Sequence, residues 1–316
     1  MKTLFRTLRH FKSHGGRLGE ALDGFFFSMK KGLTLFVPDA TYAKVYYATR
    51  LGRWPNLREP SGLNEKIQWL KLYYRHDLMP ELADKWKVRS YVRRRVGPDV
   101  LVPVHGVYRS ERDIHLKELP NRFVLKPTHG SGWVVICQDR AHFDWDTARR
   151  RLEKWMRRDY YYHAREWVYK GLEPRIICEE LLQDVDGTIP NDYKVFCFGG
   201  RPRFIQVDID RFRKHRRNLY DLEWNRIPAE ILYPGADQDP PRPVCLREML
   251  DAAAALAEPF PLCRVDFYVI GSRYYFGELT FFPGNGVEEI RPALYDRLFG
   301  DELLLPERRE MTAVAG

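Results

Sequence analysis

Apolar and polar residues alternate along this chain with two different periods, one typical of helices and the other of strands. Ile67, Leu70 and Tyr74 recur at helical spacing, and Asn64 precedes them as a candidate N-cap. Glycine and proline clusters, such as Gly97-Pro98, mark the ends of elements. The helical pattern predicts helices over 65–74, 80–95, 144–169 and 247–256.

Strand-like stretches separate these helices and complete a mixed α/β (α+β) pattern. Two pairs of strands flank short turns, at Gly199-Gly200 and at Gly271-Ser272, and each pair predicts a β-hairpin. No internal repeat or low-complexity tract interrupts the pattern. The predicted strands cover 100–107, 123–126, 174–182, 193–198, 203–207, 264–270 and 273–281.

The strand over 123–126 ends on Lys126, and a turn that includes Gly130, Ser131 and Gly132 separates it from another apolar strand. An ammonium group neutralises phosphate charge, and glycines let backbone N–H groups approach an anion closely. A Walker A loop is excluded, because that motif places its lysine after the glycines and opens a helix. Taken alone, the segment slightly favours an ordinary hairpin with a solvated lysine.

The hairpin around Gly271-Ser272 carries Arg264 and Asp266 on one face of its first strand, and Glu278 and Thr280 on its return strand. A three-residue loop would set Asp266 opposite Glu278, whereas a two-residue turn would put them on opposite faces. Paired carboxylates repel each other unless a cation joins them, and their oxygen atoms suit Mg²⁺. The alternative is a surface hairpin with an Arg264–Asp266 ion pair, and the nearby lysine turn favours the metal site.

Other polar residues are candidates for the same site. Lys85 and Arg89 lie four positions apart on one helical face. The strand over 174–182 ends in acids, and Asp192 opens the next strand, a junction suited either to binding a base and ribose or to an ordinary strand end. Lys194 faces away from its apolar neighbours and could join the polar face of this hairpin.

The segment 208–217 is strongly basic and includes Arg211 and Arg213. It is typical either of a solvated loop or of a segment that captures an acidic substrate beside the active site. His129, inside the glycine turn, could contact phosphate, although a histidine satisfied within its own turn is the commoner arrangement. No recognisable nucleic-acid-binding module accompanies the basic segment, so nucleic acid is not expected as a partner.

Composition narrows the function without selecting it. The formal net charge of +9 implies an anionic partner, and nucleotides, acidic polysaccharides, nucleic acids and anionic lipids all qualify. The sequence has neither an HExxH nor a GxSxG motif, which excludes the common zinc hydrolases and α/β-hydrolases. The 5 cysteines form no CxxC pair, and an odd number of them suits a reducing cytosol.

The first segment of the chain raises the question of membrane contact. No apolar run is long enough to span a bilayer, and basic residues interrupt the start as they would not in a signal peptide. Leu4, Phe5, Leu8 and Phe11 share one helical face, which suits either an anionic membrane surface or packing on the protein body. We favour packing and expect a cytoplasmic protein, with peripheral contact at the inner face of the membrane as the alternative.

Together these motifs resemble the ATP-grasp superfamily of carboxylate ligases, and most closely its TupA-like branch, named for teichuronopeptide biosynthesis. The order agrees: a cationic helix, a strand lysine with a glycine-rich flap, an acidic hinge, then Arg-x-Asp and Glu-x-Thr on paired strands. The resemblance covers roughly residues 40 to 300. It is carried jointly by 64–71, 83–85, 123–127, 192–194, 264–268 and 276–281.

The resemblance implies an ATP-grasp fold, in which antiparallel sheets with flanking helices clamp a nucleotide between two subdomains. The small subdomain would hold the lysine and the flap, and the large one the metal and substrate sites. The expected divisions are an N-terminal helical arm (1–60), a region preceding the ATP-grasp unit (61–120), the small subdomain (121–183), the large subdomain (184–305) and a tail (306–316).

The resemblance also implies a role for each matching residue. ATP would be held by Lys85, Arg89, Lys126, Gly130, Ser131, Gly132, Glu179, Glu180, Leu182, Asp192 and Lys194. Mg²⁺ would be held by Asp266, Glu278 and Thr280, although many ATP-grasp ligases have asparagine at the last position. Arg264 and Lys126 would be the catalytic cations that stabilise charge on the transferring phosphoryl group.

The implied reaction joins a carboxylate to an amine. ATP converts the carboxylate into an acyl phosphate, and the amine then attacks it, giving an amide, ADP and phosphate. By analogy with the family, the amide links an amino acid to a uronic or other acidic sugar of a capsule-like, cell-surface polysaccharide. Two alternatives are a glycosyltransferase acting on the same polymers and a non-catalytic protein that binds membrane or RNA.

Overall fold

The structure is a computed structural model that describes residues 32, 35–184, 186–211 and 214–307. Its small sheet has the strand order β1 (Val104–Tyr108), β4 (Ile176–Glu180), β2 (Phe123–Pro127), β3 (Val135–Cys137). Each pair of neighbours in this sheet is antiparallel. The predicted hairpin whose first strand contains Lys126 is therefore confirmed, since β2 pairs with β3 across the glycine turn.

The large sheet is also antiparallel and carries the second hairpin. Its strand order is β11 (Arg273–Thr280), β10 (Leu262–Ile270), β5 (Asp192–Phe198), β6 (Arg201–Ile209), β7 (Arg216–Tyr220), β8 (Arg226–Ile227). A two-stranded sheet joins β12 (Ile290–Arg291) to β9 (Glu230–Ile231), the latter within a stretch that shows no strand pattern in the sequence.

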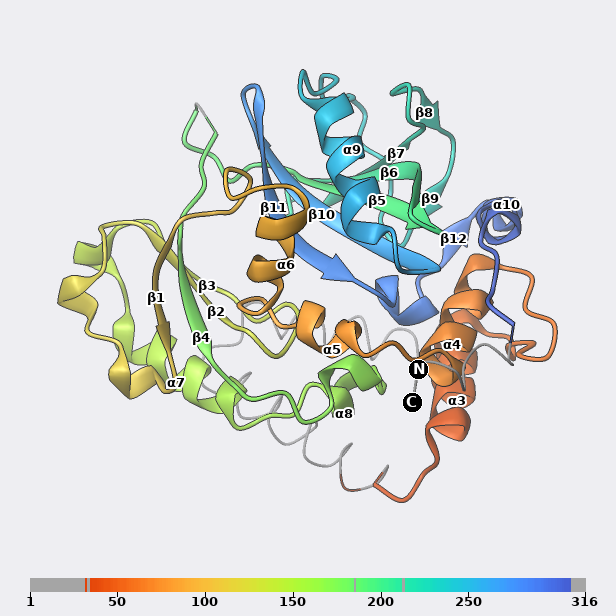
Figure 1. Ribbon diagram of the computed structural model, residues 1–316, viewed down its shortest axis with the longest axis horizontal. Coiled ribbons are helices and arrows are strands. Elements are labelled where there is room, and N and C mark those ends of the chain that lie inside the picture. The colour runs from red at the N-terminus through yellow and green to blue at the C-terminus, as the bar shows by residue number, and fades with distance from the viewer. Residues whose placement is uncertain (1–31, 33–34, 185, 212–213, 308–316) are drawn as a thin grey trace.

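Helices surround the two sheets and separate them. The α-helices are α3 (Asp39–Leu51), α4 (Leu63–Tyr73), α5 (Leu78–Ala83), α6 (Val88–Arg95), α7 (Trp145–Met156), α8 (Tyr161–Ala164), α9 (Leu246–Ala257) and α10 (Ala293–Glu302). Figure 1 shows the sheets side by side, with α5 and α6 between them. Helix α9 packs on β5, β6 and β10, and α7 packs on β2. Helix α4 contacts α10 and a 3₁₀ helix, η5 (Pro283–Gly286).

The two sheets have separate hydrophobic cores. In the small sheet, Phe123 and Leu125 of β2 pack in a cluster with Leu152 of α7. The larger cluster joins the large sheet to α4, α5, α6 and α9. The expected division into subdomains stays a prediction. The small sheet also includes β1, which comes from the region 61–120.

The helix predicted over 80–95 is wrong, because two helices, α5 and α6, replace it. The turn between them contains Asp84, whose Oδ1 accepts hydrogen bonds from the backbone N–H groups of Trp86 (2.8 Å) and Lys87 (2.9 Å). A buried aspartate that satisfies these N–H groups favours a new helix start over continuation. The predicted helix over 144–169 is likewise shorter, since α7 ends at Met156.

The sequence predicted Asn64 as the N-cap of α4, and this is wrong, because Asn64 lies inside the helix. Its side chain donates instead to the backbone oxygen of Glu288, at 2.8 Å. Asp296, on α10, accepts a hydrogen bond from the Asn64 backbone N–H at 3.0 Å. The start of α4 is thus satisfied by a residue far away in the sequence, which local pattern cannot reveal.

The second hairpin reaches the predicted pairing by an unexpected route. Ile270 pairs with Arg273, so the turn has two residues, which is the alternative that was expected to put the two carboxylates on opposite faces. Asp266 nevertheless lies opposite Glu278, because the register shifts between Asp266 and Phe267 and leaves Gly277 as an extra residue on β11. This β-bulge brings the two carboxylates to the same face of the sheet.

Several expectations fall on residues that the structure does not describe. The proposed helix containing Leu4, Phe5, Leu8 and Phe11 lies outside the described residues, as does most of the proposed arm and of the tail. Within the part of the chain that is described, no helix combines the length and the apolar character needed to cross a bilayer.

The bulge at Gly277 makes a stability prediction. A Cβ at this position would lie 3.1 Å from the backbone oxygen of Asp266. We expect Gly277→Ala to lower the free energy of unfolding by about 1 kcal/mol, and so to lower the melting temperature by about 2 °C or more. Differential scanning fluorimetry would measure this, with Gly32→Ala as the control, since a Cβ there meets nothing within 4 Å. Equal melting temperatures for both variants would contradict the bulge packing.

Candidate functional site

Charged side chains cross one face of the large sheet, with Asp266 near their centre. Asp266 lies opposite Lys194 on β5 and opposite Glu278 on β11. Arg264 donates to both of its carboxylate oxygens at 2.7 Å, and Lys194 Nζ lies 3.0 Å from Oδ2. Asp266 is only 4% exposed. The Arg264–Asp266 ion pair of the alternative interpretation therefore exists, but on an inner strand of the sheet and not on a surface hairpin.

Glu278 extends this charged face towards the helices between the sheets. Its Oε2 lies 3.4 Å from Lys85 Nζ, and its Oε1 lies 3.7 Å from Arg264 Nη2. The Thr280 hydroxyl donates to Oε1 at 3.3 Å. Burial opposes ionisation of Glu278, but Lys85, Arg264 and other cations outweigh it and lower the pKa of Glu278 to about 2. The group is therefore a carboxylate at neutral pH.

The oxygen atoms at this place fit a hard divalent cation. Asp266 and Glu278 are paired across two strands, and the hydroxyl of Thr280 lies beside Glu278. Carboxylate and hydroxyl oxygens are the ligands that Mg²⁺ accepts, usually together with substrate phosphates and water. Among the described residues, no group of three or more histidine, cysteine or acidic side chains is arranged to hold a metal alone. The predicted ligands therefore suit a metal that arrives with a phosphate.

A second cationic group lies in the small sheet, around Glu179. Lys126 Nζ is 2.8 Å from Glu179 Oε2, and Arg89 Nη1 is 3.3 Å from Oε1. Arg89 Nη2 also donates to the backbone oxygen of Val102 at 2.8 Å. Burial disfavours the ammonium of Lys126, but Glu179 and Tyr268 raise the pKa of Lys126 above its usual value. One carboxylate thus holds two cations in place.

Lys85 connects this group to the large sheet. Its Nζ donates to the backbone oxygen of Gly130 at 2.6 Å, while also lying beside Glu278. Its backbone N–H donates to the oxygen of Thr128, and the Thr128 hydroxyl donates to Asp84 Oδ2 at 2.9 Å. The turn between α5 and α6 is thereby fixed on the residues that follow Lys126.

The glycine turn after Lys126 is closely packed against aromatic rings. A Cβ on Gly130 would lie 2.7 Å from the ring of Trp133, so a larger residue would displace the turn. Gly132 has a φ of 72°, a conformation that favours glycine. The Ser131 side chain hydrogen-bonds to Tyr160. The predicted flap therefore needs glycine at two positions for two separate reasons.

The predicted adenosine contacts lie at the strand junction, although not all are free for that role. Glu180 is exposed, and Leu182 is half-buried. Glu179 is bound by Lys126 and Arg89, as described above. Asp192 is buried, accepts from Arg211 Nη1 at 2.9 Å and raises the pKa of Arg211. Lys194 Nζ lies 3.8 Å from Asp192 Oδ1. The adenosine assignment stays a prediction.

His129 is buried and contacts backbone oxygens outside the glycine turn, while its Nδ1 has no hydrogen-bond partner among the described residues. It is 2% exposed, and its Nε2 lies 3.3 Å from the Trp155 oxygen and 3.1 Å from the Arg158 oxygen. Burial lowers its pKa. The ring therefore joins the glycine turn to the end of α7, and the geometry supports packing there over substrate contact. Arg213, the other predicted substrate residue of the basic segment, lies outside the described residues.

Sequence reasoning missed Asp84 and Thr128 as residues of the site. Neither contacts the charged face directly, but together they position Lys85 and the segment after Lys126. A signal was present for Asp84, since aspartate is a preferred residue at a helix start and precedes the cationic helix by a few positions. No local signal pairs it with Thr128, because 44 positions separate the two residues.

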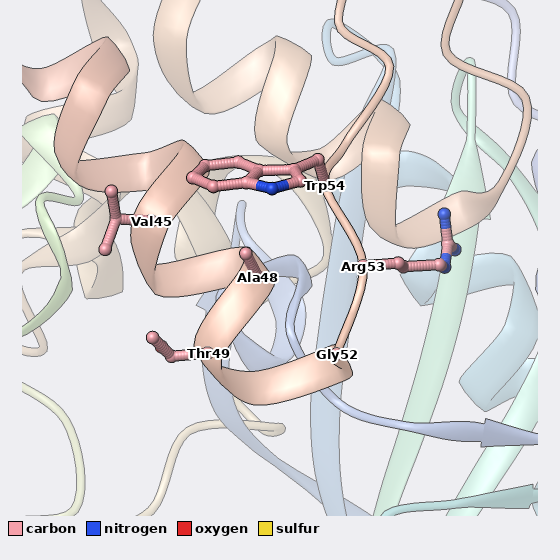
Figure 2. Close-up of a pocket in the computed structure, with 6 residues that line it drawn as sticks. All are labelled: Val45, Ala48, Thr49, Gly52, Arg53 and Trp54. Atoms are coloured by element: carbon pink, nitrogen blue, oxygen red, sulfur yellow. The ribbon is translucent and has the colours of Figure 1, made fainter.

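A pocket of about 300 Å³ lies apart from these residues, at the end of α3. Figure 2 shows its six lining residues: Val45, Ala48, Thr49, Gly52, Arg53 and Trp54. Arg53 is bound to Glu65 and Asp296, at 2.8 Å and 3.0 Å. None of the predicted site residues lines this pocket, so we do not assign it to nucleotide binding.

Comparisons with known proteins give a family and several solved structures of similar fold. A family model described as TupA-like ATPgrasp matches residues 65–304. No curated protein matches the chain. Among solved structures, D-alanine–D-alanine ligase from Bacillus anthracis, complexed with ATP, is 16% identical over 71% of this chain and 58% of that chain, with a TM-score of 0.38. L-amino acid ligase from Bacillus licheniformis is 14% identical over 73% of this chain and 50% of that chain, with a TM-score of 0.40.

The carboxylate of Glu179 makes a prediction that is independent of any ligand. Glu179→Gln would leave Lys126 and Arg89 largely buried without their shared anion. We expect the free energy of unfolding to fall by about 3 kcal/mol, the usual loss when one partner of a buried ion pair is removed. Urea denaturation would measure it. Glu180→Gln is the matched control, because its side chain is exposed on the same strand. An equal effect of both substitutions would contradict the role of Glu179.

Proposed function

This chain belongs to the TupA-like ATP-grasp family, and we propose that it is an ATP- and Mg²⁺-dependent carboxylate–amine ligase. The observation that carries the proposal is the position of Lys85, which binds the glycine turn and lies beside Glu278. This residue brings the phosphate-binding features of the small sheet next to the carboxylates of the large sheet. Phosphate transfer requires these two sets of groups on either side of the transferred phosphoryl group.

The cations of the site are arranged for the phosphates of ATP. Lys126 and Arg89 share Glu179, so they lie close together and remain charged in a partly desolvated place. A triphosphate offers more negative charge than one carboxylate and would draw both cations towards it. The backbone of the glycine turn would close over the phosphates, with Gly130 and Gly132 allowing close approach.

Asp266 and Glu278 would hold Mg²⁺, with Thr280 beside them. When bound, Mg²⁺ supplies neutralisation of negative charge at the phosphoryl oxygens. Arg264 contributes a fixed donor to the same place. Burial opposes its charge, but Asp266 holds the pKa of Arg264 above its usual value, and Nη2 also donates to Thr280 at 3.1 Å. Its guanidinium is therefore oriented before any substrate binds.

The proposed reaction has two steps. A substrate carboxylate oxygen attacks the terminal phosphorus of ATP, and the bond from this phosphorus to the bridging oxygen breaks. ADP departs, and the other product is an acyl phosphate. The neutral amine nitrogen then attacks the acyl carbon, the bond from this carbon to the phosphate oxygen breaks, and the nitrogen releases one proton to water, so that an amide and inorganic phosphate result. Lys126 and Arg264 would stabilise the charge that develops on oxygen in both steps. The turn closed by Gly130 would exclude water from the acyl phosphate.

The substrate class is a finer part of the proposal. We infer an amino acid as the amine, and a uronic or other acidic sugar of a cell-surface polysaccharide as the carboxylate. The family name and the formal charge of +9 support an acidic polymer. Arg211, which binds Asp192 at the edge of the charged face, would meet an anionic substrate there.

A screen of ADP release tests the proposed function. Uronic acids would be combined with amino acids in the presence of ATP and Mg²⁺. We expect ADP only when a carboxylate and an amine are both present, and a hydroxamate when hydroxylamine replaces the amine. ATP binding without ADP release from any pair would contradict the ligase. Transfer from a sugar nucleotide in the absence of ATP would support the glycosyltransferase alternative instead.

Lys126 makes the sharpest mutational prediction of this site. Lys126→Ala should lower the rate of ADP release by about 100-fold or more, the usual effect of removing one preorganised charge donor. Circular dichroism should show an unchanged fold. Lys117→Ala is the control, because Lys117 is an exposed lysine preceding the same strand. An unchanged rate of ADP release in Lys126→Ala would contradict the proposal that Lys126 binds phosphate.

A further inference from the structure

Helix α4 carries a buried polar face to which the proposed ATP site assigns no role. Gln68 is 0% exposed and Lys71 is 1% exposed, although both side chains are polar. Both belong to the segment 64–71, part of the resemblance to the family. Polar groups are buried at a free-energy cost unless hydrogen bonds compensate them, so this face calls for partners.

Gln68 lacks one of the partners that its burial requires. Its Nε2 donates to the backbone oxygen of Asn285 at 2.6 Å and to that of Gly286 at 3.3 Å. Carbonyl oxygens only accept, so these contacts fix which end of the amide is nitrogen. The other end, Oε1, is buried and has no hydrogen-bond donor among the described residues.

Asn285 presents a second acceptor of the same kind. It lies in η5, which packs on α4 so closely that a Cβ on Gly286 would be 2.7 Å from the Asn64 oxygen. A hydrogen bond from the Asn285 side chain lowers the pKa of Glu166, so the amide donates to this carboxylate. The remaining atom, Asn285 Oδ1, is buried and has no donor within the described parts of the chain.

Glu166 supplies a third acceptor and places the group near the reaction centre. Glu166 is 6% exposed. Burial raises its pKa to about 7, while Lys71 opposes this rise by attraction. Glu278 and Arg264 also act on its pKa, so the three charges are close enough to interact. Figure 1 shows α4 beside the end of the hairpin formed by β10 and β11.

We propose that Gln68 Oε1, Asn285 Oδ1 and the Glu166 carboxylate form the binding subsite for the ammonium group of an amino-acid substrate. A primary ammonium has three N–H donors and no acceptor, which matches two buried oxygens without donors and a carboxylate near them. This inference rests on the proposed ligase function, which requires an amine beside the acyl phosphate. Arg264, and the Mg²⁺ that Glu278 would help to hold, would bind that phosphate.

The charges of Glu166 and Lys71 in the proposed subsite favour a zwitterionic amino acid over a simple amine. Glu166 and Lys71 have opposite charges and attract each other, so the pair is close to neutral. A zwitterionic amino acid adds no net charge to a buried place, whereas a simple ammonium ion would add one. Its ammonium would meet the three acceptors, and its carboxylate would lie towards the cation of Lys71.

The first test measures binding directly, without requiring turnover. The full chain, with ATP and Mg²⁺, would be mixed with a pool of the proteinogenic amino acids, and saturation-transfer NMR would identify those that bind. A second pool would contain the same amino acids with their amines acetylated. We expect signals from at least one free amino acid and from none of the acetylated forms. No binding in either pool, or equal binding in both, would overturn the subsite.

The second test assigns the binding to the named residues. Glu166→Gln keeps the shape of the side chain and removes its charge, and Gln68→Leu removes the unpartnered acceptor. Calorimetry should show the affinity for the amino acid falling by about tenfold or more in each variant, with ATP affinity unchanged. Glu173→Gln is the matched control, because Glu173 is exposed and pairs only with Arg175 among the described residues.

The possible results separate this inference from the ligase proposal. Unchanged amino-acid affinity in both variants would mean that water satisfies the unpartnered oxygens, and the subsite would be wrong even if ADP were released normally. Loss of affinity in both variants with no ADP from any acid would leave the subsite standing and remove the ligase. If one variant fails to fold, the other variant and the acetylated pool still decide the outcome.

Discussion

The carboxylate of Asp266 is buried in the large sheet, where Arg264 and Lys194 bind it and compensate for its burial. This single constraint explains much of the site. The cations are held at fixed positions before a nucleotide arrives, and β5, β10 and β11 must keep their register for the contacts to form. Displacing one strand by one residue would move the charges to the apolar face of the sheet.

At the small sheet the roles are reversed, because there one carboxylate compensates for two buried cations. Glu179 holds Lys126 and Arg89, so that neither charge is left buried without a partner. Lys85 then joins the two arrangements through Gly130 and Glu278. In the proposed function, phosphate oxygens would replace the carboxylates around these cations. The ion pairs would thus hold the cations near the place where a polyanionic ligand binds.

Local pattern predicted most of the fold and the main parts of the site, and it failed where distant residues decide the geometry. Alternation placed Arg264 and Asp266 on one face, and the pairing of Asp266 with Glu278 was one of two alternatives. The bulge at Gly277 decides between them, because it depends on how β11 fits β10. At the break between α5 and α6, Asp84 binds two backbone N–H groups of the next turn and also Thr128, which is far away in the sequence. Glu166 shows no sequence pattern at all. Its environment is assembled from three separate segments of the chain.

The two polar regions contain different groups, and in the proposed function this difference would separate the substrates that they bind. The face that includes Arg264, Lys194 and Lys85 combines these cations with the carboxylates of Asp266 and Glu278, which would suit phosphates and a metal together. The region beneath α4 pairs Glu166 with Lys71 and leaves acceptors without donors. A phosphate would meet only repulsion from those oxygens, whereas an ammonium would complete their hydrogen bonds. In the proposed ligase, the acyl phosphate would form at the charged face, and the amine would approach it from the region of Glu166.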